Sequence, residues 1–307
     1  MATYTRTLNI YALHGHIKPG SSDEENLDYE EFFKQVYEQA QGVPIIIGTQ
    51  TVAIASVQKR ADRYAFRFIS GSGEAITEVF NPATKTAELI ELPQERFLVN
   101  GAWVIVSPTK RLLVAERKRP GVPVFEVERF LNRFAKQSGN GDVSIALNPV
   151  PSPSFVAEVE SFSRIREASV VIRRPNSSFS KTAQEAMGRI AADSNAGRVT
   201  VQANAERGQS LRKDDGLVAD ILSFAKSTLS PIEDARIKGE RPGFDGERSI
   251  SLLKHVLKGT VRLTRGLSPE KQLGAIYEEA EDLIDVATER DGGTSGGGDA
   301  GKDTLDE

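Results

Sequence analysis

RFLVNGAWVIVSPTKRLLVAERKRPGVPVFEVERFLNRFAKQ, residues 96–137, is the stretch that decides the fold. Two apolar segments, Phe97–Val106 and Arg111–Arg117, are separated by a short turn and predict a pair of β-strands. Apolar residues then recur at near-helical spacing over Val124–Gln137, which predicts an amphipathic helix. Nine basic and three acidic residues fall in this stretch, although the whole chain carries a formal net charge of −4. The stretch therefore predicts a rigid hairpin and helix that present positive charge.

Length and composition indicate a globular protein. The chain has 307 residues, of which 39% are hydrophobic and 27% are charged, and such a length predicts about two domains. The lack of cysteine excludes a disulfide scaffold and a cysteine-bound zinc site. Neither an apolar run of the ~18 residues that cross a membrane nor a secretory signal is evident. We therefore expect a cytoplasmic protein.

The charge is distributed unevenly along the chain. Residues 268–307 contain twelve acidic and three basic residues, which leaves 31 acidic and 36 basic residues in the rest. An acidic end on a basic body is typical of proteins that handle nucleic acid. Acidic tails also keep proteins in solution without any further role, and the sequence leaves both interpretations open.

The first half of the chain is rich in predicted strands. Segments of β-branched and aromatic residues, separated by turn residues, indicate five strands besides the pair above. These are Thr3–Ala12, Val43–Val57 with a break at Gly48, Tyr64–Ile69, Ala75–Phe80 and Thr86–Leu92. Asp28 predicts the start of a helix over Tyr29–Gln41, and a polar loop is expected from His14 to Asn26. We expect residues 1–140 to form a β-rich domain.

The second half mixes strands and helices after the proline-rich segment Asn148–Pro153. We predict strands at Phe155–Phe162, Ala168–Arg173 and Gly197–Ala203, and helices at Phe179–Asp193, Asp215–Leu229 and Ser268–Glu289. Arg236–Arg248 is expected to be a loop, and Ile250–Leu263 fits one strand, a hairpin or a helix followed by a strand. The predicted class is α+β, with a mixed α/β domain over 141–290 that ends in a long helix. The Gly-rich acidic tail, 291–307, is expected to be disordered.

Three groups of basic residues indicate contact with a polyanion. Several cations on one face are needed to bind duplex DNA, because each phosphate contact releases condensed counterions. The same residues could instead be solvated surface charges that distant carboxylates neutralise. The predicted DNA-binding residues are Lys110, Arg111, Arg117, Lys118 and Arg119, then Arg173, Arg174 and Lys181, then Lys254, Lys258, Arg262 and Arg265. Arg164 and Arg166 belong to the second group as well.

No pattern in the sequence predicts a catalytic residue, a metal ligand or a cofactor. A metal-dependent nuclease or phosphodiesterase could use the His14/His16 pair or Asp214, Asp215 and Asp220, but Asp215 is better explained as a helix cap. Trp103 lies in an apolar run and is expected in the core rather than against a base. A third possibility is an adaptor whose acidic C-terminal helix and tail engage a basic partner or fold back over the DNA face. We expect a protein that is not an enzyme.

The order of these elements resembles the RexA-like phage-exclusion proteins and, more distantly, KwaB-like defence proteins. The likeness rests on Phe97–Ile105 with Ser107–Thr109, the helix near Val124–Phe134, and Ala168–Arg174, and it extends over residues 3–290. Residues 205–248 form an insertion relative to that family. The resemblance implies a homodimer that binds DNA with little sequence preference and takes part in anti-phage exclusion or abortive infection. It also implies a membrane-protein partner encoded nearby.

Overall fold

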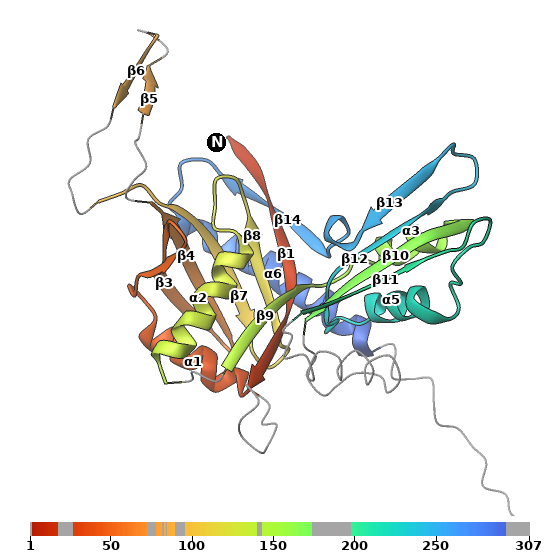
Figure 1. Ribbon diagram of the computed structural model, residues 1–307. Coiled ribbons are helices and arrows are strands. Elements are labelled where there is room, and N and C mark those ends of the chain that lie inside the picture. Colours follow the sequence, from red (N-terminus) through yellow and green to blue (C-terminus); the bar gives the residue numbers. More distant parts are fainter. Residues whose placement is uncertain are drawn as a thin grey trace, which may run out of the picture.

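The fold is α+β, as the sequence predicts, and its two larger sheets are antiparallel and lie side by side with helices packed on them (Figure 1). The computed structural model describes residues 2–17, 27–72, 78–81, 83, 85–89, 96–139, 143–173 and 198–292. No helix in these ranges has the length and apolarity needed to cross a membrane. The predicted helix Phe179–Asp193 and the tail beyond residue 292 lie outside the described residues.

The larger sheet has eight strands in the order β14-β1-β8-β7-β4-β3-β2, with β9 also paired to β1. The strand β1 is long because it pairs with β14 and β8 along its first part and with β9 along its second. The strands of the larger sheet are β1 (Thr3–Ile17), β2 (Ile45–Ile47), β3 (Gln50–Arg60), β4 (Arg63–Gly71), β7 (Asn100–Ser107), β8 (Leu112–Arg117), β9 (Val143–Pro149) and β14 (Lys258–Thr264).

The expectation of a loop starting at His14 is wrong. Strand β1 continues to Ile17 because β9 pairs with it from Tyr11↔Pro149 to Ile17↔Val143. The break predicted at Gly48 is confirmed, since Gly48 adopts φ +63° between β2 and β3. The predicted strands near residues 80 and 90 are also present, as the paired β5 (Glu78–Asn81) and β6 (Thr86–Leu89).

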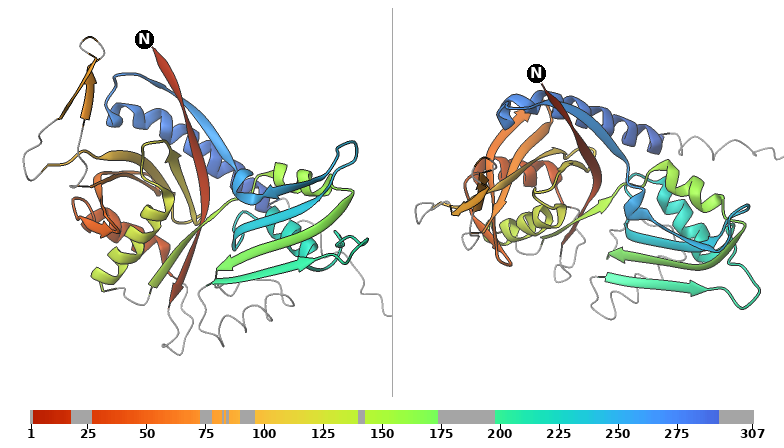
Figure 2. Two further views of the ribbon diagram at one scale, coloured as in Figure 1. Left: turned by 45° about the horizontal axis from the view of Figure 1, so that its top comes forward. Right: turned by 90° about the horizontal axis from the view of Figure 1, so that it is seen from above.

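Helices cover both faces of the larger sheet (Figure 2). Helices α1 (Tyr29–Gln39) and α2 (Val124–Gln137) pack on one face, where Phe33 of α1 and Phe130 of α2 share a core with Phe66 of β4. Asp28 caps α1 by accepting a 3.0 Å hydrogen bond from the Glu31 amide, as predicted. Helix α6 (Pro269–Gly292) packs on the opposite face against Leu8, Ile10 and Val114. The sheet is thus a two-sided core layer.

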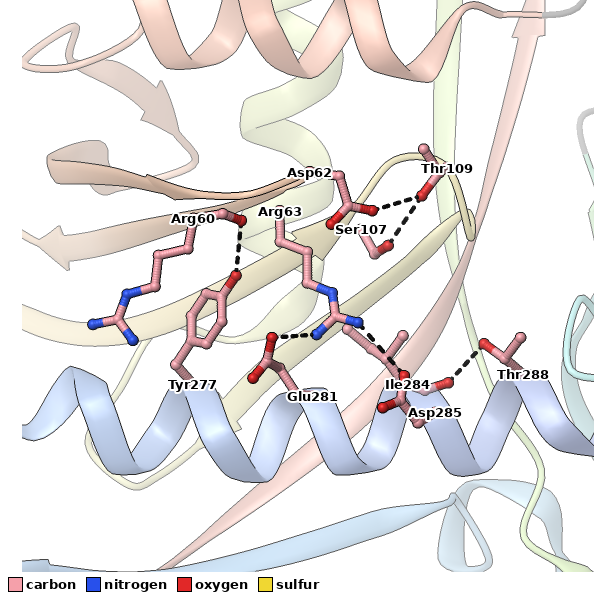
Figure 3. Close-up of polar contacts among 10 residues, drawn as sticks. All are labelled: Arg60, Asp62, Arg63, Ser107, Thr109, Tyr277, Glu281, Ile284, Asp285 and Thr288. Atoms are coloured by element: carbon pink, nitrogen blue, oxygen red, sulfur yellow. Dashed lines mark hydrogen bonds and ion pairs between the residues drawn. The ribbon is translucent and has the colours of Figure 1, made fainter.

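Polar contacts hold α6 to the β3–β4 hairpin (Figure 3) and to β7. Arg63 donates to Glu281 at 2.6 Å and to Asp285 at 3.5 Å, and Tyr277 donates to the Arg60 carbonyl at 3.1 Å. On β7, Trp103 is 2% exposed and its Nε1–H donates to the Pro269 carbonyl at 3.1 Å. The prediction of Trp103 as a core residue is confirmed.

The smaller sheet has four strands in the order β11-β10-β12-β13. Helices α3 (Pro153–Glu160) and α5 (Gly216–Lys226) pack on one face, over Ala168, Val170 and Ile237. The other face is polar, and no helix in the described part of the chain packs on it. Its strands are β10 (Arg164–Arg173), β11 (Arg198–Asn204), β12 (Ile232–Glu240) and β13 (Glu247–Ser251).

Two predictions for the second half are wrong. The segment predicted as the strand Phe155–Phe162 is helix α3, where Ser152 caps the N-terminus and Pro153 occupies the first helical position. Phe155 and Val159 are buried at a spacing of four residues, which is a helical period. The expected loop Arg236–Arg248 is instead the hairpin of β12 and β13, with the turn near Gly243.

Residues from the second half complete the larger sheet. The segment left open at Ile250–Leu263 contains the end of β13, a 3-10 turn (Leu252–Lys254) and β14, which pairs with β1. Arg290 near the end of α6 donates to the Pro151 carbonyl at 2.6 Å and to the Ala225 carbonyl at 3.3 Å. The sequence boundary expected at 140/141 therefore does not separate the two sheets, because β9, β14 and α6 all pack with the first.

Candidate nucleic-acid interface

Strand β1 brings cations from two distant parts of the chain onto one face. Thr7 pairs with Arg117 of β8 on one side and with Thr260 of β14 on the other, so these three side chains point the same way. Lys258 and Arg262 stand two residues before and after Thr260, and side chains on a strand alternate with a period of two. We define the cationic face as Arg117, Lys258 and Arg262 together with Thr5, Thr7 and Thr260.

The cationic face is large enough to span several phosphates of one DNA strand. Arg117 and β14 are separated by two strand spacings, or about 9.5 Å, and Lys258 and Arg262 are about 13 Å apart along the strand. Phosphates on one DNA strand recur every ~3.4 Å along the helix axis. The three cations are exposed, and the threonine hydroxyls between them are of the type that commonly contacts phosphate oxygens.

None of the predicted DNA-binding side chains in the described part of the chain forms an ion pair. The two further basic residues of the second group do form ion pairs. Arg164 lies 3.7 Å from Glu240, and Arg166 lies 3.8 Å from Glu247. This part of the second predicted group is therefore neutralised. The charge of Arg117, Lys258 and Arg262 stays available to a ligand.

Lys110 and Arg111 do not join the cationic face. They lie at the β7–β8 turn, at the opposite end of β8 from Arg117, and six strand residues span about 20 Å. Arg111 has φ +54°, donates to the Leu13 carbonyl at 3.4 Å and stacks its guanidinium over the Tyr29 ring at 5.2 Å. Its contacts are those of a residue that fixes the turn.

The remaining predicted residues lie at the margins. Arg265 is exposed just beyond β14, where its amide donates to the Ala2 carbonyl at 2.9 Å. Lys254 is exposed on the 3-10 turn that precedes β14. The side chain of Arg173, and Arg174 and Lys181 as a whole, lie outside the described residues.

A cleft of about 1140 Å³ opens between the two sheets. One wall comes from β1, β8, β9 and the start of α2, and it includes the segment Arg117–Arg119. The other wall is the uncovered face of the smaller sheet, where Ser169 pairs with Arg236 and Val171 pairs with Asp234. Arg117 therefore belongs both to the cationic face and to the cleft.

The carboxylates of the cleft are engaged, whereas three of its cations have no acidic partner. Arg198 lies 2.5 Å from Glu233, and Arg236 lies 3.3 Å from Asp234. Glu116 is buried, pairs with Arg6 at 3.3 Å and accepts the Trp103 amide at 3.2 Å. The other three cations of the cleft, Arg117, Lys118 and Arg119, form no ion pair within the described residues. Burial lowers the pKa of Lys118, and nearby Glu116 partly opposes this effect.

The acidic and histidine residues weighed for metal binding do not assemble. In the ranges that the structure describes, no three His, Asp or Glu side chains lie close enough to hold a metal ion. Asp215 caps α5 by accepting the Gly216 amide at 2.8 Å, as predicted. His14 is buried in β1 with its Nε2 3.1 Å from the Ser230 carbonyl oxygen. The side chain of His16 lies outside the described residues.

Sequence reasoning identified Arg117, Lys258 and Arg262 but missed the threonines and the cleft. The pairing of β14 with β1 joins residues from opposite ends of the chain, and no local pattern encodes that register. Arg236 was missed because its segment was predicted to be a loop, and Arg198 because nothing in the sequence places β11 beside β10. The alternating pattern within Thr3–Ala12 could have identified the threonines of β1, because it places Thr5 and Thr7 on the same face of the strand.

A family model described as a domain of unknown function, DUF4747, matches residues 6–228, which is most of the chain. The chain belongs to this family. The DUF4747 match takes in most of β1, all of β8 and α2, and the strands β10 and β11 of the smaller sheet, including Arg117, and ends before β12, β13, β14 and α6. No curated protein matches the chain. The family description states no activity.

Proposed function

We propose that this protein binds nucleic acid, with DNA as the first candidate, through the cationic face and without reading its sequence. The observation that carries the proposal is the convergence of Arg117, Lys258 and Arg262 on one side of the larger sheet, where they are exposed and form no ion pair with any described residue. Cations and hydroxyls that contact phosphates fix the position of a duplex but carry no sequence information. The binding should therefore depend on salt and not on base composition.

The wider role in this proposal rests on the resemblance to RexA-like proteins. It makes the chain a non-enzymatic, cytoplasmic component of an anti-phage exclusion or abortive-infection system that acts as a homodimer. A dimer would present two cationic faces, and light scattering coupled to size-exclusion chromatography would measure its mass. A single-copy mass at binding concentrations would remove this part of the proposal.

Salt-dependent binding to random-sequence duplex tests the core of the proposal. Each phosphate contact contributes about 0.9 to the slope of log K against log salt concentration, so three contacts give a slope near −2.7. The double variant K258E/R262E should weaken binding and reduce the slope by about 1.8. A signal that does not change with salt, or no binding at low salt, overturns the proposal.

A matched control separates the cationic face from net charge. Arg212 precedes α5, and Lys271 lies in the first turn of α6 on the other side of the larger sheet, and both are exposed. The variant R212E/K271E changes net charge by the same amount as K258E/R262E. It should leave the slope unchanged, and an equal loss in both variants would show that only overall charge matters.

A further inference from the structure

The cleft continues the cationic face into a space that is closed on two sides. Arg117 lies on both surfaces, and Lys118 and Arg119 follow it into the cleft wall. A chain of phosphates that lies along β14 and β1 would thus meet two further cations at the cleft, Lys118 and Arg119, which form no ion pair within the described residues. A nucleic-acid backbone bound on the cationic face would therefore run from the surface of the larger sheet to the mouth of the cleft.

Apolar and polar residues both line the cleft. The apolar side chains that reach its surface include Phe125 at the start of α2 and Val171 of β10, whereas Leu147 and Ala235 are buried in the cores of the two sheets. Ligand pockets of about 300–1,000 Å³ hold one compact organic ligand, and this cleft is of that order. It is far too small for a turn of duplex. Its chemistry suits a flat, weakly polar ring attached to an anionic backbone.

Two aromatic side chains equip the cleft for such a ring. Phe125, at the start of α2, is 50% exposed, with the Arg129 guanidinium 5.4 Å from its ring centre. Tyr11 lies deeper, and its hydroxyl accepts a 3.4 Å hydrogen bond from the Nδ2 of Asn9, a residue that is 7% exposed. Exposed aromatic rings beside cations are what proteins use to stack unpaired bases.

We propose that the cleft holds an unpaired nucleotide of the bound nucleic acid, with its base against Phe125 and its phosphate at Arg117 and Arg119. This inference rests on the proposed function and adds its preferred substrate, which is a strand end, overhang or bulge rather than continuous duplex. The cationic face holds the paired part of the same molecule. Paired bases cannot enter the cleft, because each is stacked and bonded within the helix.

Competition between two DNA probes tests the inference. One probe is a blunt 20-base-pair duplex, and the other is the same duplex with a three-nucleotide single-stranded overhang. The native protein should bind the overhang probe at least tenfold more tightly at equal salt. Equal affinity for the two probes overturns the inference, while the salt slope of the blunt probe continues to report on the proposed function. If neither probe binds, both proposals fail.

Two variants locate the preference in the cleft. V171W places a large ring in the wall on the smaller sheet, and F125S removes an exposed aromatic side chain without touching the core. Either change should reduce the preference for the overhang at least threefold and leave blunt-duplex affinity unchanged. Q202W is the matched control, since Gln202 is exposed on the same uncovered face but does not line the cleft. A preference that survives both cleft variants overturns the inference.

Discussion

Arg117 on β8 and Lys258 on β14 lie on the same face of the larger sheet with only β1 between their strands. The two residues are far apart in sequence, so their proximity depends on the antiparallel register of β1 with both neighbours. A one-residue slip of β14 would turn Lys258 and Arg262 toward α6. The cationic face is therefore a property of the folded sheet, and any binding through it should be lost on unfolding.

Charge reversal at the end of β8 should weaken DNA binding uniformly across sequences. In R117E/R119E, two exposed cations become anions beside the phosphates, and we expect at least a tenfold loss at 0.1 M salt for every duplex, since each tenfold is about 1.4 kcal/mol. Affinities for three unrelated duplexes measure this, and circular dichroism checks the fold. Lys110→Glu, at the far end of the same strand, should change little. Loss of binding to one sequence alone would contradict the prediction.

Much of the fold could be predicted from local signals. Asp215 and Asp28 marked helix starts, Gly48 marked a strand break, and Ser268 with Pro269 marked the start of α6. The helix α3 was missed because Phe155–Phe162 is a short apolar segment, and hydrophobic periodicity alone does not distinguish a short buried strand from a short buried helix. The signal that could have decided it was Ser152-Pro153, an N-cap followed by proline at the first helical position.

The site could be predicted only as a set of candidates. No local pattern in the sequence favours Arg117 over Lys110 as a phosphate contact, although Lys110 lies in the turn at the other end of the same strand. Pairing with β1 decides the matter, because it aligns Arg117 with β14 and leaves Lys110 at a distant turn. Helix α6 packs on the face of the sheet opposite to the cationic face, so the alternative in which the acidic C-terminal helix folds back over bound DNA does not apply to α6 if DNA binds the cationic face.

Two glycines should respond to alanine in opposite directions. A Cβ at Gly239 of β12 would lie 2.3 Å from the Arg164 carbonyl oxygen, so Gly239→Ala must push β10 and β12 apart, at a cost of about 1–3 kcal/mol for overpacking. A Cβ at Gly274 of α6 meets nothing within 4 Å, and Gly274→Ala should stabilise the helix by about 0.5–1 kcal/mol. Urea unfolding followed by circular dichroism measures both. A stabilised Gly239→Ala protein would show that the two strands are not closely paired there.

The bond between Trp103 and α6 should be measurable in stability. Trp103→Phe removes the Nε1–H donor to the Pro269 carbonyl and leaves a small cavity. A lost hydrogen bond costs about 0.5–1.5 kcal/mol, and the cavity adds about 24 cal/mol per Å³ of unfilled volume. We expect the free energy of unfolding to fall by more than 1 kcal/mol in urea, with no change in DNA affinity. An unchanged free energy of unfolding would contradict the packing of Trp103 against the start of α6.

Tyr11 should make stability depend on pH in the alkaline range. Burial raises the pKa of Tyr11 above its ordinary value of 10.0, while the hydrogen bond with Asn9 and the charge of Arg117 oppose the rise to a lesser extent. Between pH 10 and the raised value the unfolded chain has lost this proton and the folded chain has kept it. The unfolded state then binds fewer protons, so the free energy of unfolding falls as pH rises through this window. Below pH 10 both states keep the proton, and the contribution is constant.

The variant Tyr11→Phe isolates this effect because phenylalanine has no proton to lose. The difference in free energy of unfolding between native protein and variant should be the same at pH 7 and pH 8, and should shift in favour of the variant from pH 10 upward. Urea unfolding at these pH values supplies the differences, and absorbance of tyrosinate near 295 nm reports the titration directly. A difference that stays constant up to pH 11 would mean that the hydroxyl of Tyr11 reaches water in the cleft.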